Sequence, residues 1–246
     1  QYEALAHHLR QIPPHIHIIL SPGDHDAVRL AEPQPKLDPD FAKPLYTIPH
    51  LTLVSNPARI RIHRTNDFPG LTVLMYHGVS YTDYADLVDS IKNSGKNTSE
   101  RTELVMRYLL QRRHLAPTYG STQFIPETGE DGLLIDPLPD IILSGHIHKA
   151  THSTYRGVSL VSGGCFQQKT LYQQKFGHEP DPGCVPLLNL NTRRVTLMHF
   201  DINENTPTSN SPETSAPRSI TAPPYIHTPN ELSPTHTPTP ALPIPL

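Results

Sequence analysis

The sequence predicts a mixed α/β (α+β) domain followed by a tail. Short apolar runs bounded by Gly, Pro or Asn alternate with segments of helical period along residues 1–204. Glycine-marked loops with polar side chains follow several of these runs, and such loops are where α/β proteins bind ligands. We therefore expect one domain over residues 1–204, with its functional side chains at the ends of strands.

The tail, residues 205–246, is distinguished by its composition. It consists mainly of Pro, Ser and Thr with repeated Thr-Pro and Ser-Pro steps, and it holds many of the 28 prolines of the chain. A segment with so few large apolar residues cannot build a core, so we expect a disordered or polyproline-like tail. A glycosylated stalk would have a similar composition.

Charge and cysteine content restrict the location and the partners. The net charge of −3 offers no general basic field, so contact with DNA requires a local patch or a partner chain. Two cysteines without zinc spacing fit a reducing cytosol, and no apolar run is long enough to span a membrane. We expect a cytoplasmic protein without membrane contact. Because Gln1 is not an initiator methionine, the chain is expected to begin inside a longer reading frame.

The N-terminal quarter predicts a helix, a strand and a polar loop. Residues 1–12 place aliphatic side chains on one helical face and end before two prolines. Residues 15–20 are apolar and β-branched, as in a strand, and run into the polar loop 21–27. The proline-rich stretch 27–49 is expected to be a long ordered loop with a helical turn.

The rest of the domain predicts further strands and two helices. Residues 51–54 and 58–63 alternate apolar and polar side chains on either side of Asn56-Pro57, which is typical of a hairpin. The other expected elements are a strand at 71–76, helices at 84–91 and 100–113, and strands at 140–143, 155–161, 186–190 and 194–200.

Three loops that follow predicted strands carry carboxylate or imidazole groups: Gly23-Asp24-His25-Asp26, His77-Gly78 and Gly145-His146-Ile147-His148. Carboxylate and imidazole together suit Mn, Fe or Zn. Alternation along a strand would point His146 and His148 the same way, with Gly145 allowing a tight turn toward an ion. Two-metal sites generate hydroxide from water at neutral pH and clamp the oxygens of a phosphoester. These loops predict metal-assisted phosphoester hydrolysis, unless they are unrelated.

The order of these loops resembles the calcineurin-like metallophosphoesterases, whose later motifs read G-N-H-D/E, an isolated His and G-H-x-H. The resemblance implies a two-sheet β sandwich flanked by helices and two divalent metal ions, Mn or Mg, with Fe or Zn as alternatives. It implies that Asp24, in the place of a metal-binding Asn, binds one ion together with His77 and His146, and that His148 binds the other. His25 would donate to a phosphoryl oxygen or the leaving group, with Asp26 orienting it.

Two motifs of that family are missing from the given sequence. D-x-H and G-D-x-x-D should precede Gly23, and the 22 residues there contain neither. They would supply the bridging carboxylate and most ligands of the first ion. We therefore expect only one near-complete metal site, and little nuclease activity from these 246 residues alone.

Longer stretches of the sequence make the resemblance more specific: they resemble the small subunit of archaeal family D DNA polymerase. They are Pro22–Pro35, Met75–Gly78, Leu109–Gly120 and Gln174–Gly183. The resemblance implies a proofreading 3′–5′ exonuclease that hydrolyses the terminal phosphodiester of DNA and pairs with a polymerase large subunit. The related eukaryotic B-subunits imply the alternative, a scaffold with a decayed site. A stand-alone phosphoesterase is a third hypothesis.

Candidate DNA contacts are the cations and the exposed ring near these loops: Arg29, Arg112, Arg113, Lys149 and, for base stacking, Tyr119. For Arg112 and Arg113 the alternative is a structural role in their loop. Gln173 and the neighbouring glutamines are expected to make core or interface hydrogen bonds.

Overall fold

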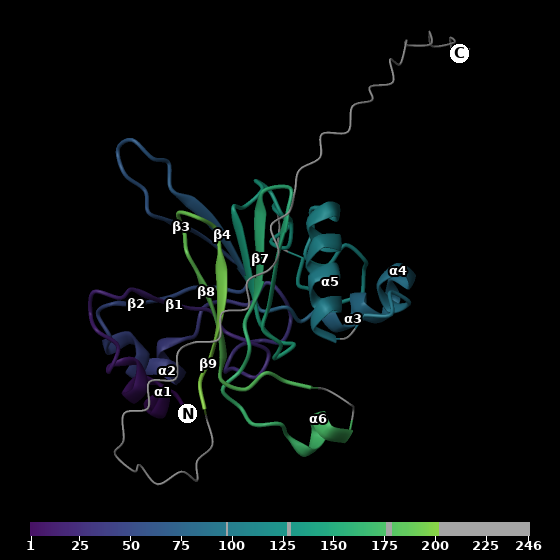
Figure 1. Ribbon diagram of the computed structural model, residues 1–246. Coiled ribbons are helices and arrows are strands. Elements are labelled where there is room, and N and C mark those ends of the chain that lie inside the picture. The colour runs from purple at the N-terminus through teal and green to yellow at the C-terminus, as the bar shows by residue number, and fades with distance from the viewer. Residues whose placement is uncertain (97, 127–128, 176–178, 202–246) are drawn as a thin grey trace.

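The computed structural model describes residues 1–96, 98–126, 129–175 and 179–201, so the expected tail lies outside the described residues. A central sheet has helices on one face and a hairpin on the other, with a small helical unit at one side (Figure 1). The elements in chain order are α1 (Tyr2–Leu9), β1 (Ile18–Leu20), α2 (Pro39–Ala42), the 3-10 helix η1 (Lys43–Thr47), β2 (Leu51–Leu53), β3 (Ala58–Ile62), β4 (Leu71–Tyr76), α3 (Tyr81–Leu87), α4 (Asp89–Lys92), α5 (Thr98–Arg112), β5 (Ile141–Ser144), β6 (Thr151–Tyr155), β7 (Val158–Ser162), α6 (Leu171–Lys175), β8 (Cys184–Leu188) and β9 (Val195–His199).

The central sheet has the strand order β3-β4-β5-β7-β6. Its inner strands β4, β5 and β7 are parallel, and the outer strands β3 and β6 pair antiparallel to their neighbours. The carboxyl ends of parallel strands meet at one edge of a sheet. The loops after β4 and β5, which carry His77 and His146, therefore lie next to each other. The expected mixed α/β class is confirmed.

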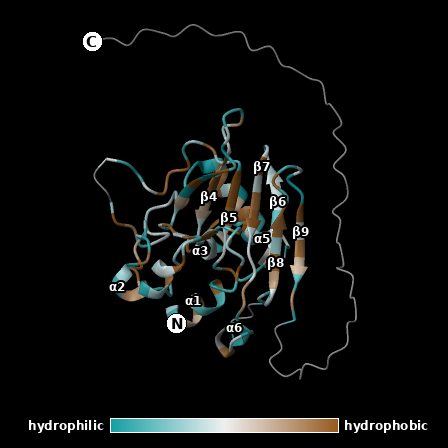
Figure 2. Ribbon diagram, turned by 90° about the vertical axis from the view of Figure 1, so that its left-hand side faces the viewer, coloured by the Kyte–Doolittle hydropathy of each residue, from teal (hydrophilic) through white to brown (hydrophobic). Residues whose placement is uncertain are grey.

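The two faces of this sheet are covered differently. Helices α3, α4 and α5 cover one face, and the core there joins Leu74 and Ile142 of the sheet to Met106 and Leu109 of α5. On the opposite face the apolar side chains of β4, β5 and β7 look toward β8 across a cavity of about 360 Å³. Figure 2 shows the apolar strands of the sheet beside the β8–β9 hairpin.

A second, smaller core supports the loop that follows β1. It is built from buried side chains of α1, α2 and η1 and of the residues just before α2 and just after η1: Ala6, Leu37, Ala42, Leu45 and Ile48. β1 pairs in parallel with β2 beside this core. In the described part of the chain, no helix combines the length and the apolar composition needed to cross a membrane.

The prediction of a hairpin around Asn56-Pro57 is wrong. β2 pairs with β1 and β3 pairs with β4, so the two strands belong to different sheets. Between them, Asn56 exchanges backbone hydrogen bonds with Gln34 (3.0 and 2.6 Å), which ties this stretch to the earlier loop. Alternation therefore marked both strands correctly but did not identify their partners.

Two other boundaries also differ from expectation. The strand expected at 155–161 corresponds to β7, and Arg156 and Gly157 instead form a two-residue turn, both with positive φ (47° and 83°), as a tight hairpin requires. The strand on the other side of this turn, β6, was not predicted. The helix expected at 84–91 begins earlier and is divided at Val88, whose backbone is extended. The short helix α6 was not predicted.

Candidate metal centre

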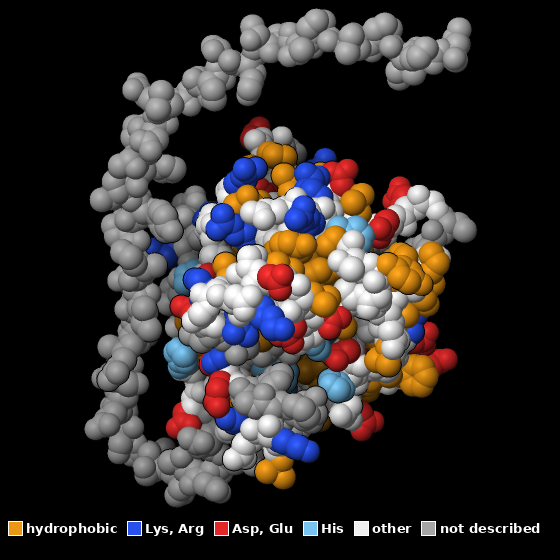
Figure 3. Space-filling model, turned by 90° about the vertical axis from the view of Figure 1, so that its right-hand side faces the viewer, with side chains coloured by type: hydrophobic (Ala, Val, Ile, Leu, Met, Phe, Trp, Pro, Cys, Tyr) orange, Lys and Arg blue, Asp and Glu red, His pale blue; other side chains and the backbone are white. Residues whose placement is uncertain are grey.

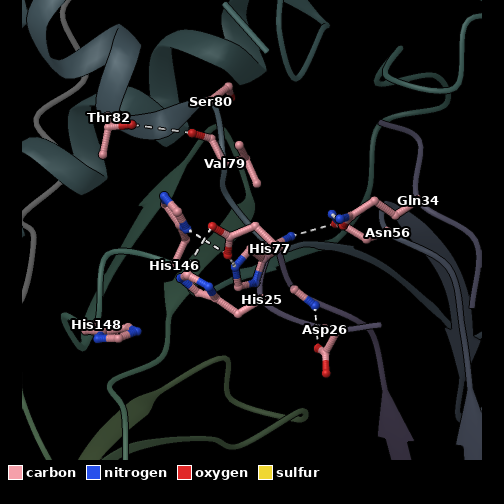
Figure 4. A network of polar contacts seen from close by, with 12 residues as sticks. His25, Asp26, Gln34, Asn56, His77, Val79, Ser80, Thr82, His146 and His148 are labelled. Atoms are coloured by element: carbon pink, nitrogen blue, oxygen red, sulfur yellow. Dashed lines mark hydrogen bonds and ion pairs between the residues drawn. The ribbon is translucent and has the colours of Figure 1, made fainter. Parts of the chain in front are cut away.

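Three strand-ending loops bring Asp24, His77 and His146 together. These residues follow β1, β4 and β5, and one ligand atom from each lies within 4.8 Å of the other two. Figure 4 shows His77 and His146 side by side. Their side chains are 24%, 23% and 21% exposed, so the group is partly buried but accessible to solvent. The structure thus collects the three residues that the sequence assigned to one ion.

The Asp24 carboxylate is the centre of the group. Its Oδ1 lies 2.8 Å from His77 Nε2 and 3.5 Å from His146 Nδ1. The two imidazole rings pack edge to face with their centroids 5.2 Å apart. The ring of His77 also lies against Gly23, where a Cβ would be 2.7 Å from its Cε1 atom. Only a residue without a side chain allows this approach.

The electrostatics suit a cation. Burial tends to raise the pKa of Asp24, but the nearby His146 and His77 hold that pKa below its ordinary value. Burial lowers the pKa of His146, although Asp24 partly opposes this effect. An ionised carboxylate and a neutral imidazole are the protonation states that metal binding needs, and this mixed donor set suits Mn, Fe or Zn. The residues therefore fit one divalent ion.

The backbone of Gly145-His146-Ile147-His148 differs from the expected strand end. β5 ends at Ser144, so strand alternation does not apply to the two histidines. His146 and His148 themselves have left-handed backbones (φ 64° and 60°), whereas Gly145 does not. The prediction that Gly145 makes the tight turn is therefore wrong. A left-handed backbone at a residue other than Gly costs about 1–3 kcal/mol and is typical of functional sites.

His148 lies apart from the other three residues (Figure 4). Its Nδ1 is 2.9 Å from the side-chain amide of Gln173 on α6. Because an amide NH₂ only donates, Nδ1 is the acceptor, and the neutral ring carries its proton on Nε2. The sequence grouped Gln173 with residues making core or interface hydrogen bonds but gave no signal for this partner, because α6 was not predicted.

The other two residues of the first loop have different environments. The His25 side chain is 99% exposed, with Nε2 3.9 Å from Asp24 Oδ2. Asp26 accepts hydrogen bonds from the backbone N–H of Gly23 (2.8 Å) and from the Tyr2 hydroxyl (2.9 Å). Asp26 thus joins this loop to α1, and its orientation of His25 stays a prediction.

Residues 2–153 match the model of the alpha/epsilon B-subunit family of DNA polymerases. The chain belongs to this family. It is 40% identical over 195 residues to the DNA polymerase II small subunit of Pyrococcus horikoshii, covering 79% of this chain and 29% of the relative. Identity is 42% over 190 residues to that of Methanocaldococcus jannaschii, with coverage of 77% and 30%.

A third relative, the DNA polymerase II small subunit of Halobacterium salinarum, is 36% identical over 200 residues, or 81% of this chain and 37% of the relative. The resemblance to archaeal polymerase small subunits expected from the sequence is confirmed. The chain spans about a third of the length of these relatives.

In this member of the B-subunit family, several residues that are candidates for DNA contact also make hydrogen bonds or ion pairs within the protein. Arg113 donates to the Ile135 carbonyl and to Asp136, at 2.6 Å each. Lys149 pairs with Asp181 at 2.8 Å, and Arg29 donates to the carbonyl of Pro33. Contact of these cations with DNA stays a prediction.

The remaining two candidates have different surroundings. Arg112 stacks over the ring of Tyr108, with 5.1 Å from its guanidinium carbon to the ring centroid, whereas the Tyr119 ring is fully exposed. On the face over α3, α4 and α5, the described Lys and Arg side chains alternate with Asp and Glu (Figure 3). DNA binding on that face would depend on local contacts, not on a broad basic field.

Proposed function

We propose that this chain is the phosphoesterase part of the small subunit of an archaeal replicative DNA polymerase. As part of that subunit it acts as a metal-dependent 3′–5′ exonuclease that hydrolyses the terminal phosphodiester of DNA. The observation that carries the proposal is the cluster of Asp24, His77 and His146 at the ends of three strands. Family membership supports the polymerase context.

Asp24, His77 and His146 would hold one divalent ion, Mn or Mg, with Fe or Zn as alternatives. His148 would belong to a second ion, because it lies outside the one group of three ligands found among the described residues. When bound, such ions supply Lewis-acid polarisation of a phosphoryl oxygen and a hydroxide nucleophile at neutral pH. Metal binding requires ionised Asp24 and unprotonated His146, and the pKa shifts of both favour those states.

His25 would act on the substrate directly. Its imidazole is almost fully exposed on the loop that carries Asp24, within reach of a phosphodiester placed over the cluster. We assign to it proton donation to a phosphoryl oxygen or the leaving 3′ oxygen, a step that contributes about 10²–10⁴-fold in comparable enzymes. Tyr2 and Gly23, through Asp26, hold the loop in place.

The fold and the partners form part of the same proposal. The β8–β9 hairpin faces the central sheet across an apolar cavity, which supports a two-layer, calcineurin-like arrangement. The relatives are named small subunits, which supports pairing with a polymerase large subunit. The substrate would be the 3′ end of DNA at the polymerase site.

The test uses the longest reading frame that contains the chain, together with its large subunit. A 5′-labelled duplex with a 3′ mismatch should shorten one nucleotide at a time with Mn²⁺ and stay intact with a chelator. His25→Ala should slow this by at least about 100-fold, whereas His15→Ala, at another exposed histidine, should not. If the labelled strand is not shortened, and His25→Ala is indistinguishable from wild type, the proposal is contradicted.

A second candidate is a scaffold subunit with a decayed site. It is favoured by the separation of His148 from the cluster and by the carboxylate of Asp24, which adds negative charge where the substrate phosphate would lie. In this case wild type would have no nuclease activity. Recovery of Mn²⁺-dependent nuclease activity in Asp24→Asn would identify decay at this position.

A further inference from the structure

A buried polar network lies directly behind the metal-ligand cluster. Glu32, Gln34 and Asn56 are 0%, 1% and 0% exposed. Burying such groups costs free energy unless their hydrogen bonds are made, and here the bonds connect the loops that carry the candidate ligands. The sequence gave Glu32 and Gln34 no role and placed Asn56 in a turn.

Asn56 is the centre of this network (Figure 4). Its Oδ1 accepts a 2.7 Å hydrogen bond from the backbone N–H of His77. Its Nδ2 donates to Gln34 Oε1 at 2.7 Å and to Glu32 Oε1 at 3.3 Å. Both amide protons and the amide oxygen therefore have partners, so the side chain can take only one orientation.

The network reaches both loops that carry the Asp24–His77 pair. Gln34 Nε2 donates to the backbone carbonyl of Arg29, at the end of the loop that carries Asp24. Glu32 Oε2 accepts from the hydroxyl of Tyr76, the residue before His77, at 3.1 Å. These bonds attach the backbone on both sides of the 2.8 Å contact between Asp24 and His77 to one buried unit.

We propose that Asn56, held by Gln34 and Glu32, is a positioning residue that sets the separation of the Asp24 and His77 ligand atoms. This inference rests on the proposed metal centre. Asp24 and His77 lie in loops that follow strands of different sheets, so strand pairing does not hold them in register. Metal sites require ligand distances within about 0.2 Å, which two loops without a shared support would not maintain.

The first test is a Mn²⁺ titration of the chain. Asn56→Ala and Gln34→Ala should weaken binding about 10–100-fold, the loss typical when groups that orient ligands are removed. Tyr84→Phe is the matched control, because it removes a buried hydroxyl bonded to Thr118 and Ser121 outside the network. It should bind within about twofold of wild type. If Asn56→Ala does not fold, Gln34→Ala decides the test.

A second readout needs no metal. In ¹⁵N–¹H spectra of the metal-free chain, Asp24 should hold His77 as the Nε2–H tautomer, because a carboxylate only accepts hydrogen bonds. Asn56→Ala and Gln34→Ala should average the two tautomers, and Tyr84→Phe should not.

The two readouts separate the two proposals. Absence of Mn²⁺ binding in wild type would count against the metal centre alone, and the tautomer would still decide the role of Asn56. An unchanged tautomer, or unchanged Mn²⁺ affinity in Asn56→Ala and Gln34→Ala, would overturn that role.

Discussion

Gly23→Ala is the sharpest perturbation of the cluster that leaves every candidate ligand in place. Gly23 does not have a positive φ, so alanine fits its backbone and the effect is steric alone. The added Cβ would stand 2.7 Å from His77 Cε1 and 3.0 Å from Nε2, whereas ordinary contact begins at 3.4 Å. The His77 ring must therefore move by about 0.7 Å, the difference between 3.4 and 2.7 Å.

That movement is larger than the tolerance of about 0.2 Å in metal–ligand distances. We expect Mn²⁺ affinity to fall at least tenfold, which is about 1.4 kcal/mol of binding free energy. Overpacking in a close-packed site costs about 1–3 kcal/mol of stability. The lower part of that range applies here, because the His77 side chain is 23% exposed and has room to turn.

Calorimetric Mn²⁺ titration and thermal unfolding measure the two effects. Gly145→Ala is the control, since its Cβ would meet His77 only at ordinary contact distances of 3.8 and 4.0 Å. Its affinity should equal that of wild type. If Gly23→Ala also bound Mn²⁺ as tightly as wild type, the closeness of Gly23 to His77 would have no bearing on metal binding.

Three further predictions concern stability. Burial raises the pKa of the Glu32 carboxyl group. The folded chain therefore binds the carboxyl proton more tightly than the unfolded chain does. The stability that Glu32 contributes consequently falls as the pH rises above the ordinary pKa of a glutamate. Denaturant unfolding of Glu32→Gln between about pH 4 and 8 should lack this slope; an identical slope would exclude Glu32 as its source. Arg113→Ala should lower the free energy of unfolding by about 1 kcal/mol, because it loses bonds to Ile135 and Asp136 that are partly open to solvent. Weaker DNA binding at unchanged stability would contradict this. Gly157→Ala should lower the free energy of unfolding by about 1 kcal/mol in thermal unfolding, because the added Cβ has open space but the φ of 83° disfavours alanine. Unchanged stability would contradict the left-handed backbone of this turn.

The sequence predicted the strands that deliver the ligands but not how all of them pair. Apolar runs bounded by turn residues located β1, β4 and β5. The loops after β4 and β5 meet because these two strands are parallel neighbours that end at one edge, whereas β1 belongs to another sheet. The partners of β2 and β3 were missed, because period-two alternation reports burial and not pairing.

The missed features of the site have a similar cause. The left-handed backbones of His146 and His148 depend on tertiary contacts, because residues other than Gly rarely adopt that conformation. Asn56 precedes a proline and was assigned to a turn, whereas its function depends on Gln34, 22 positions earlier in the chain. Such a pairing has no local signature.

Asp24, His77 and His146 are proposed to form one divalent metal site. A calorimetric titration of the 246-residue chain with Mn²⁺ tests it most directly. One ion should bind per chain, Asp24→Ala should weaken binding by at least about 100-fold, and Asp67→Ala, at an exposed carboxylate, should leave it unchanged. Two tightly bound ions, no bound ion, or equal binding in Asp24→Ala would contradict the claim.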